Sequence, residues 1–231
     1  MTPSRSGRSG PVHAGGKRRA VLFDLGGLFV NVHIDRGFKA LHGAFPSLSE
    51  TAIREACLAP DLQGAYEKGR ITTFGFHDEI NRRLGRNIPF EQFRTGWQDV
   101  FTPNPPLIRF LHRLPSQIRK IVLSNTNELH VQFISAHFDI LRHFDGHVYS
   151  HETGFAKPEK EIYQKALSVA DAGPDECLFV DDLEENVTAA EALGIRSHRF
   201  TGNEAFFRFW QELIVSGDLR SEPGTKPDSY L

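Results

Sequence analysis

The chain has 231 residues, of which 39% are hydrophobic and 24% charged, and its formal net charge is −2 at pH 7. This length suits one α/β domain with a small insertion, and the composition is that of an ordinary globular protein. No apolar run approaches the roughly 18 residues that cross a bilayer, and Cys57 and Cys177 are too few and too far apart for a disulfide scaffold or a zinc site. These features exclude a membrane protein and a disulfide-rich secreted protein, and they favour a cytoplasmic one.

Residues 1–19 form a basic segment that is rich in Ser, Gly and Pro. They carry five basic side chains and no acid, so the charge of this segment is +5 and that of the remainder is −7. The segment lacks the apolar core of a signal peptide and the Leu and Phe of an amphipathic transit sequence. We therefore expect a disordered tail, and the acidic remainder argues against nucleic acid as a partner.

The first predicted strand spans residues 20–23 and is followed by Asp24 and a glycine pair. Residues 33–104 then read as helix almost throughout, with a capping box predicted at residues 47–50 and an aromatic-rich helix at 90–101. We assign Phe93 and Trp97, which lie at helical spacing, to the core of this segment. A mostly helical insertion after the first strand of an α/β sheet is typical of a cap.

From residue 118 short apolar strands alternate with amphipathic helices. This alternation predicts a parallel sheet with right-handed crossovers. The sequence therefore divides into an α/β core (residues 20–32 and 105–215), a helical cap (33–104) and a polar C-terminal tail (216–231). The expected strands are residues 120–124, 147–149, 178–180 and 195–200, and the expected helices are 128–137, 159–170, 184–193 and 204–215.

Polar residues stand at the ends of several predicted strands or in the loops that follow them. Each residue alone is weak evidence for a functional site, since an Asp after a strand is often a helix cap and a Ser-Asn pair is often a turn. Together they would meet at one edge of a parallel sheet, where ligands bind. A carboxylate there can attack phosphorus, a Mg²⁺ ion prefers such oxygen ligands, and a lysine supplies fixed positive charge. The residues are Asp24, Ser124, Asn125, Lys157, Asp181 and Asp182.

Four motifs make the chain resemble the haloacid dehalogenase superfamily, subfamily IA, over about residues 20–200. They are Phe23–Gly27, Leu123–Asn127, Gly154–Pro158 and Phe179–Asp182. Within that subfamily the chain is most similar to the α-D-glucose-1-phosphate phosphatase-like group, which shares the Asp-Leu-Gly and Ser-Asn-Thr-Asn sequences and a Gly-Trp-Gln like residues 96–98 in its cap.

The resemblance implies a three-layer Rossmannoid parallel sheet with a small helical cap of the C1 type. It also implies a Mg²⁺-dependent phosphatase that hydrolyses a small phosphomonoester, such as a sugar phosphate, through an aspartyl-phosphate, as a monomer or homodimer. The resemblance also implies a role for each site residue. Asp24 is the nucleophile and a Mg²⁺ ligand, and the Gly26 carbonyl and Asp182 are further Mg²⁺ ligands, with Asp181 in support. Ser124, Asn125, Gly26 and Gly27 bind the phosphate, and Lys157 anchors the phosphoryl group.

The chain departs from the family pattern at Gly26. Most phosphatases of the superfamily carry there an Asp that serves as general acid and base, which is worth about 10²–10⁴-fold in rate. Its absence allows either an enzyme whose leaving group needs little protonation or a phosphate-binding module with little turnover. His33 and Asp35 lie close enough in sequence to supply the missing acid, or they are solvated hinge residues.

Overall fold

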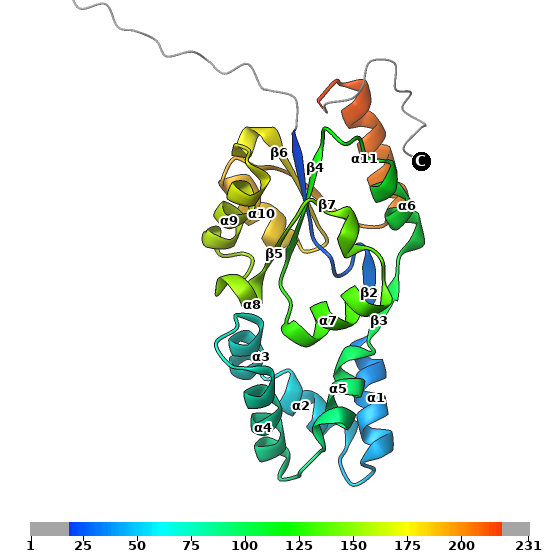
Figure 1. The fold of residues 1–231 in the computed structure, drawn as a ribbon, viewed down its shortest axis with the longest axis vertical. Coiled ribbons are helices and arrows are strands. Elements are labelled where there is room, and N and C mark those ends of the chain that lie inside the picture. Colours follow the sequence, from blue (N-terminus) through cyan, green and yellow to red (C-terminus); the bar gives the residue numbers. More distant parts are fainter. Residues whose placement is uncertain (1–18, 219–231) are drawn as a thin grey trace, which may run out of the picture.

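The structure, a computed structural model, describes residues 19–218. The predicted basic tail up to residue 18, and the predicted C-terminal tail from residue 219, lie outside the described residues. A five-stranded parallel sheet forms the middle layer of a three-layer α/β fold (Figure 1), so the predicted fold class is confirmed. The strand order is β5–β4–β1–β6–β7. The strands are β1 (Ala20–Phe23), β4 (Arg119–Ser124), β5 (Gly146–Tyr149), β6 (Cys177–Asp181) and β7 (Arg196–Arg199).

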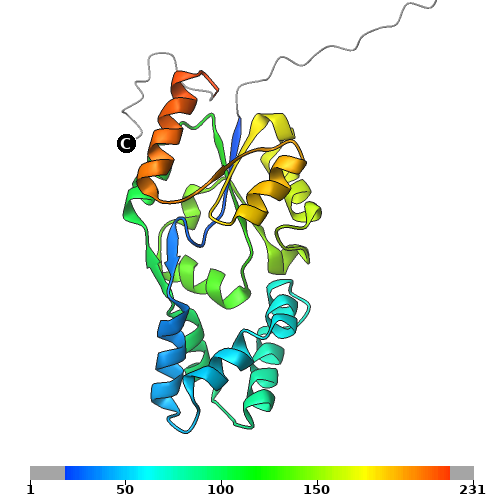
Figure 2. The ribbon, with the colours of Figure 1, turned by 180° about the vertical axis from the view of Figure 1, so that it is seen from behind.

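Helices cover both faces of the sheet because alternate residues of each strand point to opposite sides. On one side Val21 and Phe23 pack with α6 and α11. On the other side Ala20 and Leu22 pack with α9 and α10. Figure 2 shows these two helical layers to either side of the sheet. The core helices are α6 (Pro105–Arg113), α7 (Glu128–His137), α8 (Ser150–Thr153), α9 (Lys160–Ala170), α10 (Glu184–Ala192) and α11 (Asn203–Val215), with 3-10 turns at Leu141–His143 and Pro174–Glu176.

Five further helices form a separate cluster, which we call the cap. They lie beyond the carboxyl ends of the strands (Figures 1 and 2) and enclose an apolar core of their own, in which Phe93 and Trp97 are buried as predicted. None of the helices within residues 19–218 is long and apolar enough to cross a membrane. The cap helices are α1 (Ile34–Ala44), α2 (Glu50–Cys57), α3 (Pro60–Glu67), α4 (Thr73–Leu84) and α5 (Phe90–Gln98).

A two-stranded antiparallel ribbon joins the core to the cap. It pairs β2 (Val30–Val32) with β3 (Phe101–Pro103), the two points at which the chain passes between these parts. The helix predicted for residues 90–101 is therefore wrong at its end: it stops at Gln98, and Phe101 pairs with Val32 instead. The predicted capping box is also displaced, because Ser49 caps α2 and its Oγ accepts the N–H of Ala52 at 3.1 Å.

Candidate active site

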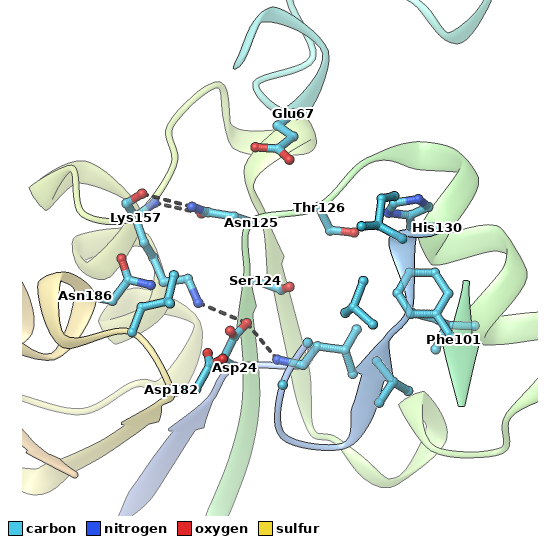
Figure 3. A pocket seen from close by; sticks show the side chains of 18 of the residues that line it. Asp24, Glu67, Phe101, Ser124, Asn125, Thr126, His130, Lys157, Asp182 and Asn186 are labelled. Carbon is cyan, nitrogen blue, oxygen red and sulfur yellow. Dashed lines mark hydrogen bonds and ion pairs between the residues drawn. The ribbon is translucent and has the colours of Figure 1, made fainter. Parts of the chain in front are cut away.

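A cavity of about 560 Å³ opens where the carboxyl ends of the strands meet the cap (Figure 3). Ligands of open parallel sheets bind at this end of the strands. Of the residues predicted to form the site, only Asp181 does not line the cavity. Residues that are far apart in the sequence are thus brought together by the topology of the sheet. Those on the cavity wall are Asp24, Gly26, Gly27, Ser124, Asn125, Lys157 and Asp182.

Asp24 extends the central strand by one residue. Its N–H donates to the carbonyl of Val180 at 2.9 Å, and its own carboxylate oxygen Oδ1 accepts the N–H of Leu25 at 2.7 Å. Only 12% of the side chain is exposed. These bonds hold the carboxylate at the tip of the strand, facing the cavity.

The tight turn after Asp24 needs a glycine at position 27. Gly27 has a φ of +72°, and a Cβ atom there would lie 2.3 Å from Oδ2 of Asp182. A larger residue at position 27 would therefore displace the carboxylate of Asp182. Gly26 differs, because a Cβ at this position would make only an ordinary contact, 3.5 Å from Cγ2 of Val32.

Lys157 is a buried cation between two carboxylates. Its Nζ lies 2.9 Å from Oδ1 of Asp24 and donates to Oδ2 of Asp181 at 2.6 Å. The side chain of Asn125 holds the backbone of the same lysine: its Nδ2 donates to the Lys157 carbonyl at 2.9 Å, and its Oδ1 accepts the Lys157 N–H at 2.7 Å. The side chain of Asn125 therefore positions Lys157, and since its Nδ2 carries a second N–H, phosphate binding stays a prediction for this residue.

The three carboxylates could hold a divalent cation. Asp24, Asp181 and Asp182 each place an oxygen within 4.8 Å of the others, and Lys157 is the one cation that pairs with Asp24 and Asp181 among the described residues. Asp181 already accepts hydrogen bonds at both oxygens, from Lys157 on one and from Leu183 N and Asn186 Nδ2 on the other. Asp24 and Asp182 are therefore the better ligands, and such an all-oxygen donor set suits Mg²⁺.

Burial of this cluster changes its acid–base properties. Burial raises the pKa of Asp24 to about 6, an effect that Lys157 opposes and the charge of Asp181 reinforces. Burial and then Asp181 also raise the pKa of Asp182. Burial acts to lower the pKa of Lys157, but the charges of Asp24 and Asp181 outweigh it and the net pKa is raised. The lysine therefore stays charged at neutral pH, whereas the carboxylates would ionise more readily beside a further cation.

Ser124 provides a hydroxyl at the same edge of the sheet. The residue ends β4 and is 4% exposed, and its hydroxyl points into the cavity (Figure 3). It lies beside the Asp24–Lys157 pair (Figure 3). An anion between them would meet a hydroxyl donor on one side and an ammonium group on the other.

The two residues considered as replacements for the missing acid do not reach this cavity. His33 Nε2 is hydrogen-bonded to Thr102 Oγ1 at 2.8 Å beside the ribbon, and Asp35 pairs with Arg54 on the cap surface. Neither lines the cavity wall. The structure therefore does not bring them to the site.

Two titratable side chains on the cavity wall were not anticipated from the sequence. Burial raises the pKa of Glu67, at the end of α3, and its Oε1 accepts the amide of Gln63 at 2.9 Å. Burial lowers the pKa of His130 to about 4; its Nε2–H donates to the Trp97 carbonyl at 3.1 Å. His130 therefore stays neutral at pH 7 and joins α7 to the cap.

The chain is similar in sequence to known hydrolases. The haloacid dehalogenase-like hydrolase family matches residues 18–194. The sesquiterpene phosphatase astK of Aspergillus oryzae is 44% identical over 155 residues, which cover 64% of this chain and 77% of that protein. Acyl-CoA dehydrogenase family member 10 of Mus musculus is 27% identical over 225 residues, or 93% of this chain, but the chain spans only 21% of the mouse protein.

Solved structures share the fold. A haloacid dehalogenase family enzyme from Bacteroides thetaiotaomicron, in complex with magnesium and inorganic phosphate, superimposes with a TM-score of 0.70. It is 26% identical, and the match covers 80% of this chain and 96% of that one.

Proposed function

Because the chain belongs to the haloacid dehalogenase-like hydrolase family, we propose that it is a Mg²⁺-dependent phosphatase that releases phosphate from a small phosphomonoester through an aspartyl-phosphate on Asp24. The observation that carries this proposal is the buried Lys157, whose Nζ lies 2.9 Å from Oδ1 of Asp24 at the end of the central strand. Two relatives support it, since one is a sesquiterpene phosphatase and one was crystallised with magnesium and inorganic phosphate.

The reaction has two transfers. In the first, a carboxylate oxygen of Asp24 bonds to phosphorus while the bond from phosphorus to the ester oxygen breaks, and the released alcohol oxygen takes a proton from water. In the second, a water oxygen bonds to phosphorus and the bond to Asp24 breaks, which yields inorganic phosphate and restores the carboxylate. The attacking water gives up a proton to solvent, where it neutralises the hydroxide left when the alcohol was protonated. Lys157 and Ser124 bind the phosphoryl oxygens through both transfers.

Asp24 and Asp182, with the Gly26 carbonyl, would hold the Mg²⁺ ion. When bound, the ion neutralises charge on the phosphoryl group and on the nucleophile. Asp181 does not contact the substrate in this scheme; it orients Lys157 and, through Leu183 N, the loop that carries Asp182.

The experiment that tests this function is phosphate release from a panel of acetyl phosphate, α-glucose 1-phosphate and glucose 6-phosphate. We expect turnover with Mg²⁺ and a loss of about 10²-fold or more with EDTA, since charge stabilisation by a metal contributes several kcal/mol. Restoring Mg²⁺ should restore the rate. If no compound on the panel is hydrolysed faster than in protein-free buffer, the chain is a phosphate-binding module without turnover.

Replacing Gly26 with Asp asks whether the scaffold can use a general acid. The protein should fold, because the new Cβ makes only an ordinary contact with Val32. We expect about a tenfold gain in kcat for glucose 6-phosphate and little change for acetyl phosphate, because only the alkoxide leaving group needs a proton. The matched control is Gly26→Asn, which has the same size and no acid. An equal gain in the Asn variant would refute general acid catalysis as the cause.

A further inference from the structure

Beyond the phosphate-binding end, the cavity wall is mainly hydrocarbon. We propose that the phosphate ester it accepts is that of an apolar alcohol of isoprenoid size, whose chain lies against the ribbon and α7. This inference rests on the proposed phosphatase function and names its substrate class. The cavity volume of about 560 Å³ lies within the range of small-molecule sites. The apolar residues on its wall are Leu25, Val30, Val32, Ile34, Leu58, Trp97, Phe101, Ile134 and Leu183.

Two of these side chains leave much apolar surface uncovered. Val32 and Leu183 are each 49% exposed, and both line the cavity. Val32 is beside Phe101 in the ribbon, and Figure 3 shows Phe101 on the wall opposite Lys157 and Asn186. The cavity thus has a charged side that fits phosphate and an apolar side that fits hydrocarbon. Covering Val32 and Leu183 with an apolar ligand removes this surface from water, which favours binding.

Some of the polar side chains on the wall are already hydrogen-bonded within the protein. Each hydroxyl of a bound sugar needs a hydrogen-bonding partner, since an unpaired buried polar group is costly. Gln63 and Glu67 are bonded to each other at 2.9 Å. His130 uses Nε2 for the Trp97 carbonyl and Nδ1 for the amide of Asn127 at 3.0 Å. Other polar atoms of the wall have no hydrogen bond to the described residues: the Thr126 hydroxyl, Glu67 Oε2 and Asn186 Oδ1. The apolar part of the wall, rather than a lack of polar partners, is therefore what favours a hydrocarbon over a sugar.

Gly26 extends the apolar surface to the reacting end of the cavity. The residue has no side chain, and its α-carbon stands next to Val32, as the 3.5 Å contact of a built Cβ with Cγ2 shows. An acid at this position would lie against the valine methyl group. Its absence leaves a continuous apolar path from the phosphoryl site along the ribbon, which a hydrocarbon chain can follow from its first carbon atoms.

The test compares kcat/KM for farnesyl phosphate, below its micelle-forming concentration, with kcat/KM for glucose 6-phosphate and α-glucose 1-phosphate. Acetyl phosphate, which has almost no organic part, reports the phosphate-binding end alone. We expect farnesyl phosphate to be preferred over both sugar phosphates by about 10²-fold or more, since each methylene in an apolar pocket contributes a factor of about ten or more. A preference for either sugar phosphate, with acetyl phosphate still hydrolysed, overturns the substrate class but leaves the phosphatase function intact. If acetyl phosphate is not hydrolysed either, both the substrate class and the phosphatase function are refuted.

A matched pair of variants tests whether the hydrocarbon chain of the substrate lies against the apolar wall. Val32→Asn keeps the size of the side chain and, because the residue is half exposed, should not prevent folding. We expect it to lower the ratio of kcat/KM for farnesyl phosphate to that for acetyl phosphate about tenfold. Val215→Asn makes the same change at a valine that is 77% exposed at the end of α11, outside the cavity, and should leave the ratio unchanged. An unchanged ratio in Val32→Asn would overturn the proposed placement.

Discussion

Asp24→Asn should lower phosphate release by about 10⁴-fold or more, because an amide cannot form the covalent intermediate and loss of a nucleophile has effects of this size. Folding should be retained. The amide has the size of the carboxylate, its oxygen can still accept the Leu25 N–H, and removing one of three clustered negative charges relieves repulsion with Asp181. The measurement is kcat for acetyl phosphate, with thermal unfolding of both proteins as the control for folding.

The matched control for this variant is Asp78→Asn, which makes the same chemical change at a side chain that is 81% exposed on the cap. It should have wild-type activity. Should the Asp24 variant fall within tenfold of the wild type while the protein stays folded, another group must be the nucleophile.

Lys157→Met should reduce both stability and activity. The side chain of Lys157 is 1% exposed and that of Asp181 is 0% exposed, so the change leaves a buried carboxylate without its counter-charge. Removing one partner of a buried ion pair costs about 3–5 kcal/mol. Loss of a preorganised charge at the phosphoryl group should lower kcat by about 10²–10³-fold. Urea unfolding with EDTA present measures the first effect, and phosphate release with saturating Mg²⁺ measures the second.

A second variant separates these two effects. Lys157→Met combined with Asp181→Asn removes the unpaired carboxylate, so it should recover part of the lost free energy of unfolding. Activity should not recover, because no cation returns to the phosphoryl site. A double variant that regained activity would show that Lys157 acts only through its pairing with Asp181.

The residues at the strand ends could be predicted from sequence because their position depends on local pattern. An apolar run that ends in Asp24, or in Ser124, puts that residue at the carboxyl end of a strand. Because the strands are parallel, their carboxyl ends meet at the same edge of the sheet. Lys157, in the loop after α8, was also expected at this edge, but its ion pair with Asp181 was not predicted from the sequence.

Other features could not be predicted because they depend on contacts between distant segments. The ribbon pairs residues 30–32 with residues 101–103, and three-residue strands leave no readable alternation. The amide of Asn125 holds the backbone of Lys157, 32 residues later, a contact that the sequence does not indicate. Glu67 faces the cavity only because of the way the cap helices pack on the core.

The apolar wall was missed for a related reason. Val32 is the last residue of the first predicted core segment (residues 20–32), and Phe101 reads as the end of a helix. Their shared face becomes a cavity wall only when the ribbon forms. Under the proposed function, the cap insertion and its two connections would set the substrate specificity of the site, and the strand ends would supply its chemistry.

The most direct test of the central claim is to look for the phosphoryl group on Asp24. The enzyme is mixed with excess acetyl phosphate and Mg²⁺, quenched in acid within its first turnover, and digested for mass spectrometry. We predict that a peptide containing Asp24 gains the mass of one phosphoryl group, and that the Asp24→Asn protein gains none. A protein that turns over acetyl phosphate rapidly while its phosphoryl group is found on another residue would contradict the assignment of Asp24 as the nucleophile.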